Sequence, residues 1–298
     1  EYKDKNNKLE IIYQKNENNG FAGGNNKGFN YLLNNSLIDK DSLVAILNPD
    51  AYANEKWLEQ LVECINGSEE IGIVTGKTIL AETNKIDSTG DFYNQYGLPF
   101  PRGRGCDIEA YKKTEEVFAS SGCQMLIRVN YLLQIRLKNG QFFNEEYFMY
   151  FEDVDLSIRM RRIGKKIFYN PEAKVLHLCG YSSKGDQIKN KLVTYNTSKN
   201  YWLLFFGAEK KKVIRKLLIK FLFAQILSLI ITLTSVQKIK FKLIPKLKGM
   251  FYGLFSIRRS LKLNKEIEKK DNFSVENFES LIDRQGFLFD TKIVKLNK

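Results

Sequence analysis

The sequence predicts an α/β fold with a mostly parallel sheet, on the basis of three consecutive segments. Residues 43–47 form an uninterrupted apolar run that ends at an Asn-Pro-Asp turn, which is typical of a strand buried on both faces. A helix capped by Asn54 and ended by Gly67 should follow, because apolar residues between them recur at helical spacing. Residues 71–80 are again typical of a strand. A strand, a helix and a strand in this order favour a parallel sheet flanked by helices.

The segments on either side extend this prediction. The apolar run from Leu9 to Tyr13 indicates a strand, and the Asn- and Gly-rich residues 16–30 indicate a loop leading into a helix through Leu33. Residues 87–116 contain several Gly and two Pro and are typical of a long loop, which in a compact domain is more often functional than not. Later in the chain, a helix is predicted at residues 152–162 and strands at residues 118–128, 167–169 and 174–178.

The net charge of +13 is concentrated in the last third of the chain. Residues 201–298 contain 21 basic and 8 acidic side chains, whereas residues 1–200 are balanced at 26 of each. Between Lys210 and Lys265, fifteen Lys or Arg occur without an Asp or Glu. A charge of this size is typical of a protein with a polyanionic partner, and its confinement to one apolar segment favours an anionic membrane surface over nucleic acid. A nucleic-acid binder that uses the basic segment is the alternative from another class.

The uncharged run at residues 221–236 is short for a membrane span. As a helix it covers about 24 Å, against about 30 Å of hydrocarbon. Extending it back to Leu217 admits Lys220, whose amino group can reach the interface. Basic residues flank the run on both sides and give no orientation. We expect an interfacial helix or a re-entrant hairpin on the cytoplasmic leaflet, with a short or tilted span and an ordinary buried core helix as alternatives.

Composition therefore divides the chain into three parts. These are an α/β domain at 1–200, a basic and apolar helical region at 201–265 that associates with a membrane, and a tail at 266–298 with a strand at 292–296. The four cysteines form no C-x-x-C pair, which argues against a zinc ribbon, a redox motif or a disulfide framework and favours a reducing cytosol. No leader opens the chain and its first residue is Glu, so we expect a fragment or a trimmed chain.

Two segments of the first domain could bind a phosphorylated ligand. The Gly-rich residues 20–28 join a predicted strand to a predicted helix, where bare N–H groups and a helix N-terminus can hold phosphate. They match neither common nucleotide-binding spacing, and a plain Gly-rich turn is the alternative. Asp50 follows the end of a predicted parallel strand, where open α/β sheets bind ligands, and an Asx turn is its alternative.

Two further segments could contribute acid–base or metal chemistry. Glu152, Asp153 and Asp155 begin a predicted helix, where carboxylates satisfy free N–H groups and oppose the helix dipole. The aromatic run before them could raise the pKa of a carboxyl towards that of a useful base. His177 is the single histidine in the chain, which excludes a multi-histidine zinc site. It can be a structural residue at a strand end or add one nitrogen to a metal site of carboxylate and phosphate.

Five short motifs occur in an order that resembles family 2 glycosyltransferases, particularly the rhamnosyltransferase-like branch. They are Asn-x-Gly-Phe-Ala-Gly-Gly-Asn-Asn at 18–26, Asn-Pro-Asp at 48–50, Ser-Gly-Cys at 121–123, Tyr-Phe-Glu-Asp-Val-Asp-Leu-Ser-x-Arg at 150–159 and His-Leu-x-Gly-x-Ser at 177–182. The resemblance covers residues 9 to about 200. It implies a GT-A fold, which is a Rossmann-like, mixed and mostly parallel sheet flanked by helices, together with a nucleotide-sugar donor and an inverting mechanism.

The resemblance also implies roles for individual residues. Asp50 corresponds to the last residue of the metal-binding Asp-x-Asp element, with Asn48 in place of its first Asp, and His177 matches a residue near the metal and the diphosphate. Asp153 matches the catalytic base of a Glu-Asp pair that includes Glu152. The loop near donor sugar and acceptor is Ser121, Gly122 and Cys123. Donor-binding residues are expected at Gly23, Gly24, Asn25, Asn26, Asn48 and Asp50.

The expected function is transfer of a sugar, rhamnose by the resemblance, to a hydroxyl of a lipid-linked (polyprenyl) saccharide in cell-surface polysaccharide synthesis. The expected cofactor is Mg²⁺ or Mn²⁺, and the expected location is the cytoplasmic face of the cell membrane, peripheral or monotopic. The family begins with a strand, a helix and a strand that hold the nucleotide, and such a unit needs about 30 residues. Eight precede Leu9, so we expect an incomplete nucleotide-binding half. The alternative function is therefore a catalytically inactive GT-A remnant that serves as a membrane-bound partner in a polysaccharide assembly complex.

Overall fold

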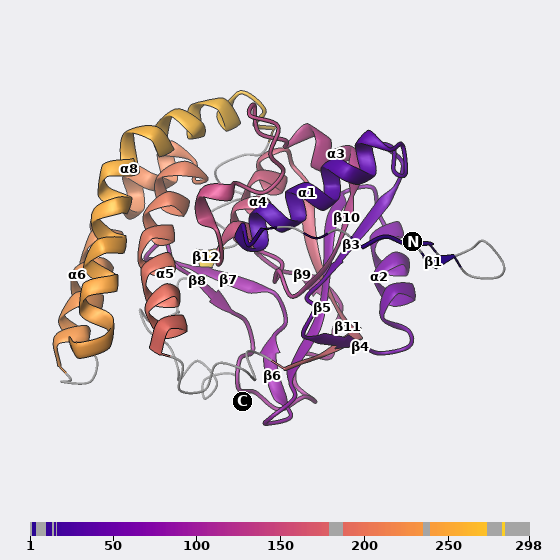
Figure 1. Ribbon diagram of the computed structural model, residues 1–298, viewed down its shortest axis with the longest axis horizontal. Coiled ribbons are helices and arrows are strands. Elements are labelled where there is room, and N and C mark those ends of the chain that lie inside the picture. Colours follow the sequence, from indigo (N-terminus) through magenta and orange to yellow (C-terminus); the bar gives the residue numbers. More distant parts are fainter. Residues whose placement is uncertain are drawn as a thin grey trace.

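The computed structural model describes residues 2–3, 10–13, 15, 17–178, 187–234, 239–272 and 282–283. A mixed sheet forms the centre of the molecule (Figure 1), with the strand order β3-β10-β5-β11-β4. The strands are β3 (Leu43–Leu47), β10 (Gln124–Arg128), β5 (Ile71–Leu80), β11 (Lys166–His177) and β4 (Ala51–Ala53), with β6 (Lys85–Ser88) on β5 and β9 (Glu115–Glu116) on β11. β10 is antiparallel to both β3 and β5, and β11 is parallel to β5, so β3, β5 and β11 run in one direction. The predicted α/β class with a mixed sheet is confirmed, and β5 with β11 is the one parallel pair of this sheet among the described residues.

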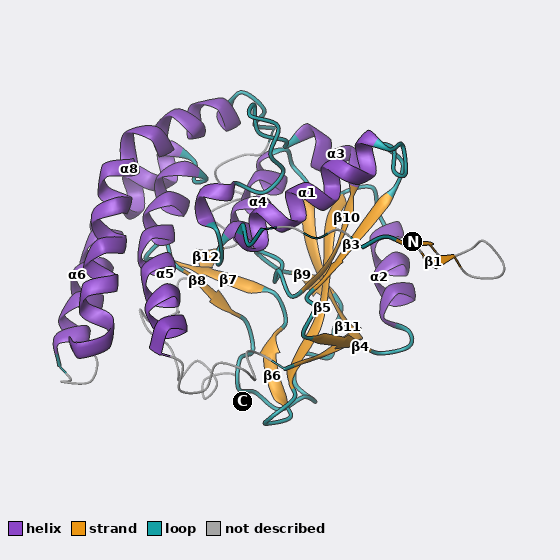
Figure 2. Ribbon diagram, in the orientation of Figure 1, coloured by secondary structure: helices purple, strands orange, loops and turns teal. Residues whose placement is uncertain are grey.

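Helices cover both faces of this sheet (Figure 2). One face packs on α2 (Trp57–Asn66), and the other on α1 (Gly20–Asn34), α3 (Val129–Gln134) and α4 (Glu152–Arg162). Successive strand residues alternate between the two cores, as pleating requires. In β10, Leu126 belongs to the core under α2, while Met125 and Ile127 belong to the core under the other three helices.

Three predictions about local structure are wrong in informative ways. β3 is an edge strand among the described residues, and Leu47 is 37% exposed, so this apolar run is not buried on both faces. α1 begins at Gly20, so the Gly-rich segment is helical rather than a loop. Asn54 does not cap α2, because its side chain pairs with the backbone of β11, accepting from Lys174 N and donating to Glu172 O. The local pattern alone does not decide these features, because they depend on which elements pack beside each segment.

The segment expected to be a long loop contains several short strands. β6 and β9 extend the main sheet, and β7 (Asp91–Asn94) and β8 (Pro99–Pro101) form a second sheet with β12 (Ile282–Asp283). The strand predicted at 118–128 is confined to β10, and the two strands predicted within 167–178 are one strand, β11, with an irregular register between Asn170 and Lys174. β1 (Tyr2–Lys3) and β2 (Glu10–Ile11) pair with each other, while Leu9 and the strand predicted at 292–296 lie outside the described residues.

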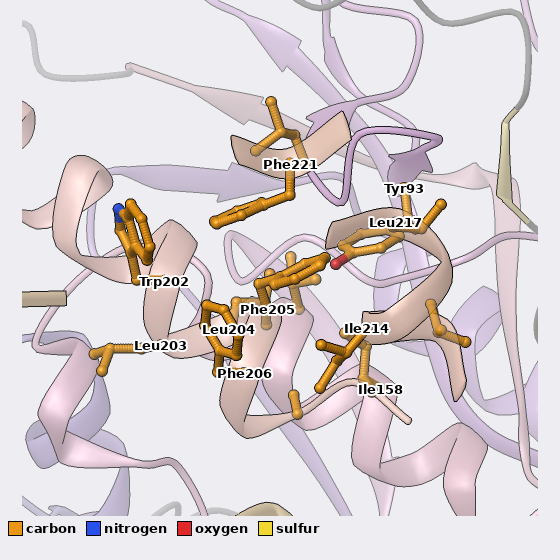
Figure 3. Close-up of a cluster of buried hydrophobic side chains, with 14 of the residues drawn as sticks. Tyr93, Ile158, Trp202, Leu203, Leu204, Phe205, Phe206, Ile214, Leu217 and Phe221 are labelled. Atoms are coloured by element: carbon orange, nitrogen blue, oxygen red, sulfur yellow. The ribbon is translucent and has the colours of Figure 1, made fainter. Parts of the chain in front are cut away.

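Three long helices form a layer beside the sheet domain: α5 (Gln187–Gly207), α6 (Lys211–Leu233) and α8 (Ile244–Glu268), with a π-helical turn, η3 (Ile239–Leu243), before α8. The boundary predicted at residue 201 falls inside α5. Figure 3 shows that α5 and α6 bring their aromatic and aliphatic side chains together with residues of the sheet domain. The cluster includes Tyr93, Ile158, Trp202, Phe205, Phe206 and Phe221. The helical layer therefore shares a core with the domain before it.

Small residues let α8 lie close against α5. A Cβ atom on Gly249 would lie 2.4 Å from Tyr195 O, and one on Gly253 would lie 2.6 Å from Trp202 Cβ. Gly249, Gly253, Ser256 and Ser260 are all buried and recur at three- and four-residue spacing. They form one face of α8, so the helix contacts α5 along its length.

Candidate active site

The topology brings the ends of several strands to one edge of the sheet. β3, β5 and β11 end there because they run in the same direction, and β10 begins there because it runs in the opposite direction. Gln124, the first residue of β10, pairs with Leu47, the last residue of β3. The segments at 48–50 and 121–123 and His177 therefore meet at this edge, although they are far apart in the sequence.

His177 lies between two carboxyl groups at the end of β11. Its Nε2 is 3.4 Å from Asp50 Oδ1, and its Nδ1 is 3.0 Å from Asp87 Oδ2. Asp87 also accepts from Arg104 Nη2 at 2.6 Å. The hydrogen bond to His177 and the charge of Arg104 outweigh burial and lower the pKa of Asp87, so this carboxyl stays ionised. The imidazole is thereby fixed with Nε2 facing Asp50.

Backbone hydrogen bonds attach this group to the loop before β10. Asn48 N donates to Cys123 O at 2.9 Å, and Leu178 N donates to Asp50 O at 2.9 Å. Cys123 is buried, and this burial raises the pKa of its thiol, which leaves the sulfur as a packed, protonated group. The structure thus joins three of the predicted site segments.

Asp153 meets the same loop from the first turn of α4. Its Oδ2 accepts from Gly122 N at 2.6 Å, and its Oδ1 accepts from Val154 N at 2.8 Å. A Cβ atom on Gly122 would lie 3.1 Å from that Oδ2 and 3.2 Å from the Phe21 ring, so glycine suits this close approach. Burial raises the pKa of Asp153 despite these hydrogen bonds, which makes the carboxylate a better proton acceptor than an exposed aspartate.

Two other carboxyl groups lie in the electrostatic environment of Asp153. Burial and the Asp153 charge raise the pKa of Glu152 and of Asp91 well above the usual range. Glu152 Oε2 is buried without a hydrogen-bond partner among the described residues, whereas Asp153 accepts two N–H groups. We therefore assign the negative charge of this group to Asp153. Asp155 is committed elsewhere, because it forms a buried ion pair with Arg159 at 2.8 Å.

The predicted donor-binding residues of α1 differ in their surroundings. Asn26 is buried, and its amide bonds to the backbone of Phe142 and Phe143 and to the Glu145 side chain. Asn25 donates to Phe21 O, and no atom lies within 4 Å of a Cβ placed on Gly24. Gly23 lies against Asn19. A donor-binding role for these residues stays a prediction, and the Phe21 ring of α1 lies beside Gly122.

Sequence reasoning missed Asp87, Asp91 and Arg104. All three fall in the segment assigned to a long loop, and an Asp on either side of a Ser-Thr-Gly turn was the available signal. Cys179 to Ser182, the rest of the histidine motif, lie outside the described residues.

The residues at the sheet edge fit a divalent cation that is shared with a phosphorylated ligand. In the described part of the chain, no three His, Cys, Asp or Glu side chains form a cluster that could hold a metal by themselves. Asp50 and His177 offer one oxygen and one nitrogen, and His177 is oriented by a carboxylate as metal-binding imidazoles commonly are. Phosphate oxygens and water would complete the coordination of Mg²⁺ or Mn²⁺.

Comparisons with known proteins identify a family and a fold. The model of the family "Glycosyltransferase like family 2" matches residues 4–197. The low-salt glycan biosynthesis hexosyltransferase Agl10 of Haloferax volcanii is 27% identical over 150 residues, which cover 49% of this chain and 44% of that protein. The crystal structure of GalNAc-T7 with UDP, GalNAc and Mn²⁺ superposes over 84% of this chain and 45% of its own with a TM-score of 0.50 and 13% identity. The structural likeness confirms the predicted fold, and this chain spans less than half the length of both proteins.

Proposed function

The chain belongs to family 2 of the glycosyltransferases, and from that premise we propose that it moves a sugar from a nucleotide-diphosphate donor to an acceptor hydroxyl, using Asp153 as the base. The observation that supports this most is the contact between Asp153 and Gly122, which brings the Glu-Asp pair of α4 to the Ser-Gly-Cys loop. A carboxylate with a raised pKa beside a loop at the ligand-binding edge of the sheet suits proton removal from a hydroxyl.

In the proposed reaction the acceptor oxygen attacks the anomeric carbon from the face opposite the leaving group. Asp153 takes the hydroxyl proton as the new C–O bond forms, and the bond to the diphosphate breaks with its electron pair leaving on the nucleotide. Glu152 stays protonated beside it, because burial and the Asp153 charge raise its pKa. A single negative charge is then available to accept the proton.

Asp50 and His177 would hold a divalent cation at the donor diphosphate. Such an ion stabilises negative charge on a departing nucleotide. Asp87 fixes the tautomer of His177. Its ionised carboxylate accepts a hydrogen bond from Nδ1–H, which leaves Nε2 unprotonated and able to bind a cation. The edge of the sheet thus serves the donor, and the Gly122 loop serves the sugar and the acceptor.

A lipid-linked saccharide at an anionic membrane is the proposed acceptor. One helix of the described residues, α6, is long and apolar enough to cross a membrane. Its exposed face is basic in the first turns, with Lys212, Arg215 and Lys216, and apolar in the last turns, with Ile226 and Ile230 58% and 51% exposed. Cationic side chains followed by exposed apolar ones suit a helix lying at an anionic interface. Rhamnose as the sugar rests on the motif resemblance.

The test is product analysis with a panel of nucleotide sugars and a polyprenyl-diphosphate saccharide presented in vesicles. We expect a glycosylated product with inverted anomeric configuration from one donor in the presence of Mn²⁺. Retained configuration would contradict the inverting mechanism. Absence of turnover with every donor would favour the inactive membrane-bound partner instead.

A further inference from the structure

The loop that precedes the Glu-Asp pair has an unusual backbone. Phe148, Tyr150 and Phe151 have φ angles of 63°, 70° and 71°, in the left-handed region that non-glycine residues seldom adopt. At Phe148 the ψ angle is −58°, and Met149 N donates to Tyr147 O at 2.7 Å, which closes a strained γ-turn. Such a backbone persists only where surrounding groups hold it in place, and strain of this kind gathers at functional sites.

Asn200 of α5 holds three carbonyl groups of this loop at once. Its side chain is fully buried, and Nδ2 donates to the oxygens of Tyr147, Met149 and Tyr150 at 3.1, 2.8 and 2.8 Å. Asn200 Oδ1 has no hydrogen-bond partner among the described residues. The opposite amide orientation would direct an oxygen at three carbonyl oxygens, so the loop itself fixes the orientation of the amide.

Lys199, the preceding residue, holds the start of the same loop. Its Nζ donates to the carbonyl oxygens of Glu146 at 2.6 Å and Tyr147 at 3.4 Å. Burial lowers the pKa of Lys199 to about 8, and the charge of Glu146 opposes this effect. The rings of Tyr195 on α5 and Tyr252 on α8 lie 5.7 and 5.6 Å from Nζ.

Other helices fix the loop from two further sides. Gly20 of α1 permits a close approach, because a Cβ atom there would lie 2.0 Å from Phe148 O. On α8, Tyr252 and Arg259 both donate to the Glu146 side chain, and Arg259 also forms an ion pair with it. The side-chain hydrogen bonds to the backbone carbonyl groups of the loop that are described above come from Lys199 and Asn200 of α5.

We propose that Lys199 and Asn200 are positioning residues of the transfer reaction, which hold residues 147–151 in their left-handed course so that α4 begins where Asp153 meets Gly122. The inference rests on the proposed role of Asp153. Phe151 immediately precedes α4 at φ 71° and ψ 0°, so relaxation of the loop changes the direction in which the helix starts. A displacement of about 1 Å at a reacting group can reduce a rate about 100-fold.

Hydrogen exchange tests the structural half of the proposal, and it needs no nucleotide sugar. Lys199→Met keeps the length of the side chain and removes its donors, and Asn200→Asp keeps the shape and replaces the amide donor with an acceptor. We expect the backbone amides of residues 147–153 to exchange at least about tenfold faster in either variant. The reason is that each variant loses buried hydrogen bonds to the loop, those of the charged Lys199 ammonium group or those of the Asn200 amide. Lys191→Met, the same change at an exposed position of α5, should leave them unchanged. Unaltered exchange in both variants overturns the inference.

Steady-state kinetics with the nucleotide sugar that the product analysis selects test the catalytic half. Lys199→Met should lower kcat by about 10- to 100-fold with a nearly unchanged KM for the donor, because the base moves while the donor site at the sheet edge does not. In the wild type, kcat should fall as the pH rises through about 8, where Lys199 loses its charge, and this limb should be absent from Lys199→Met. Wild-type kcat in both variants, or a limb that persists in Lys199→Met, overturns the inference. Retained turnover in Asp153→Asn would instead contradict the proposed function, so the two failures are distinguishable.

Discussion

The sheet edge and the helical layer use charge in opposite ways. At the edge, carboxyl groups gather and neighbouring side chains set their charge: Asp87 stays ionised between His177 and Arg104, while Glu152 stays protonated beside Asp153. In the helical layer, the exposed basic side chains of α6 lie next to exposed apolar ones. From this contrast we infer that the first region serves the transfer reaction and that the second contacts an anionic membrane surface. The helix that joins them is α5, which packs into the shared core and also bonds the loop before Asp153.

Of the changes that test this contrast, a substitution at Asp153 should have the largest effect, and that effect is on kcat. Asp153→Asn keeps the size of the side chain and removes the proton acceptor, so kcat should fall by about 10²- to 10⁴-fold while donor affinity stays the same. In the wild type, activity should be lost as the pH falls through the pKa of Asp153, because the base must be ionised. Since burial raises that pKa, the loss should begin at a higher pH than for an exposed aspartate. Glu59→Gln, at an exposed position of α2, is the control, and turnover that survives in Asp153→Asn refutes the assignment.

Much of the sheet and part of the site could be predicted from the sequence. β3, β5 and α4 follow from local apolar patterning and from an acidic first turn, and these signals do not depend on the rest of the fold. The hydrogen bond from Gly122 to Asp153 could not be predicted from periodicity, because it joins residues 31 positions apart through tertiary packing. Asp87 and Arg104 lie in a segment whose short strands pair with β5, with β11, with β12 and with one another, so they depend on tertiary packing. The Gly-rich start of α1 has weak helix propensity, and its contact with Phe148 stabilises a course that propensity alone would not choose.

The second-largest effect is expected on binding of the donor nucleotide at Asp50 and His177. Asp50→Ala should weaken Mn²⁺-dependent binding of the donor nucleotide about 10- to 100-fold, because one of two side-chain ligands is lost. Asp87→Asn should weaken it by a similar factor through His177, because an amide no longer fixes the tautomer of the imidazole. Calorimetry with and without Mn²⁺ measures both, and Glu59→Gln serves again as the control. Equal binding with and without the metal in the wild type would contradict the ligand assignment.

A buried acid at the junction of the two regions offers a stability test. Glu209 is fully buried after α5, neither of its carboxyl oxygens has a hydrogen-bond partner among the described residues, and burial raises its pKa to about 8. The unfolded chain releases this proton near the usual value for glutamate, whereas the folded chain keeps it to about pH 8, so the free energy of unfolding should fall as the pH rises between these values. Glu209→Gln should lack this fall and be more stable than the wild type at pH 8 by on the order of 2 kcal/mol.

Urea unfolding at pH 5 and pH 8 measures this difference. The variant and the wild type should differ much less at pH 5, because this pH lies just above the usual pKa of glutamate and the pH-dependent loss of stability has barely begun. A constant difference at the two pH values would mean that Glu209 acts through packing rather than through its proton.

The smallest expected effect concerns the surface that the helical layer presents. Ile219 lies on the outer face of α6 and is 82% exposed, so Ile219→Asp changes that surface without removing a core contact. Placing a carboxylate there removes apolar area and adds repulsion from anionic lipid, which should reduce binding to anionic vesicles about tenfold. Leu58→Asp makes the same kind of change on α2, where Leu58 is 48% exposed, and should leave vesicle binding unaltered. Flotation with anionic and neutral vesicles distinguishes the outcomes: equal loss in both variants would mean that net charge alone drives binding, and the exposed face of α6 would then have no specific role at the membrane.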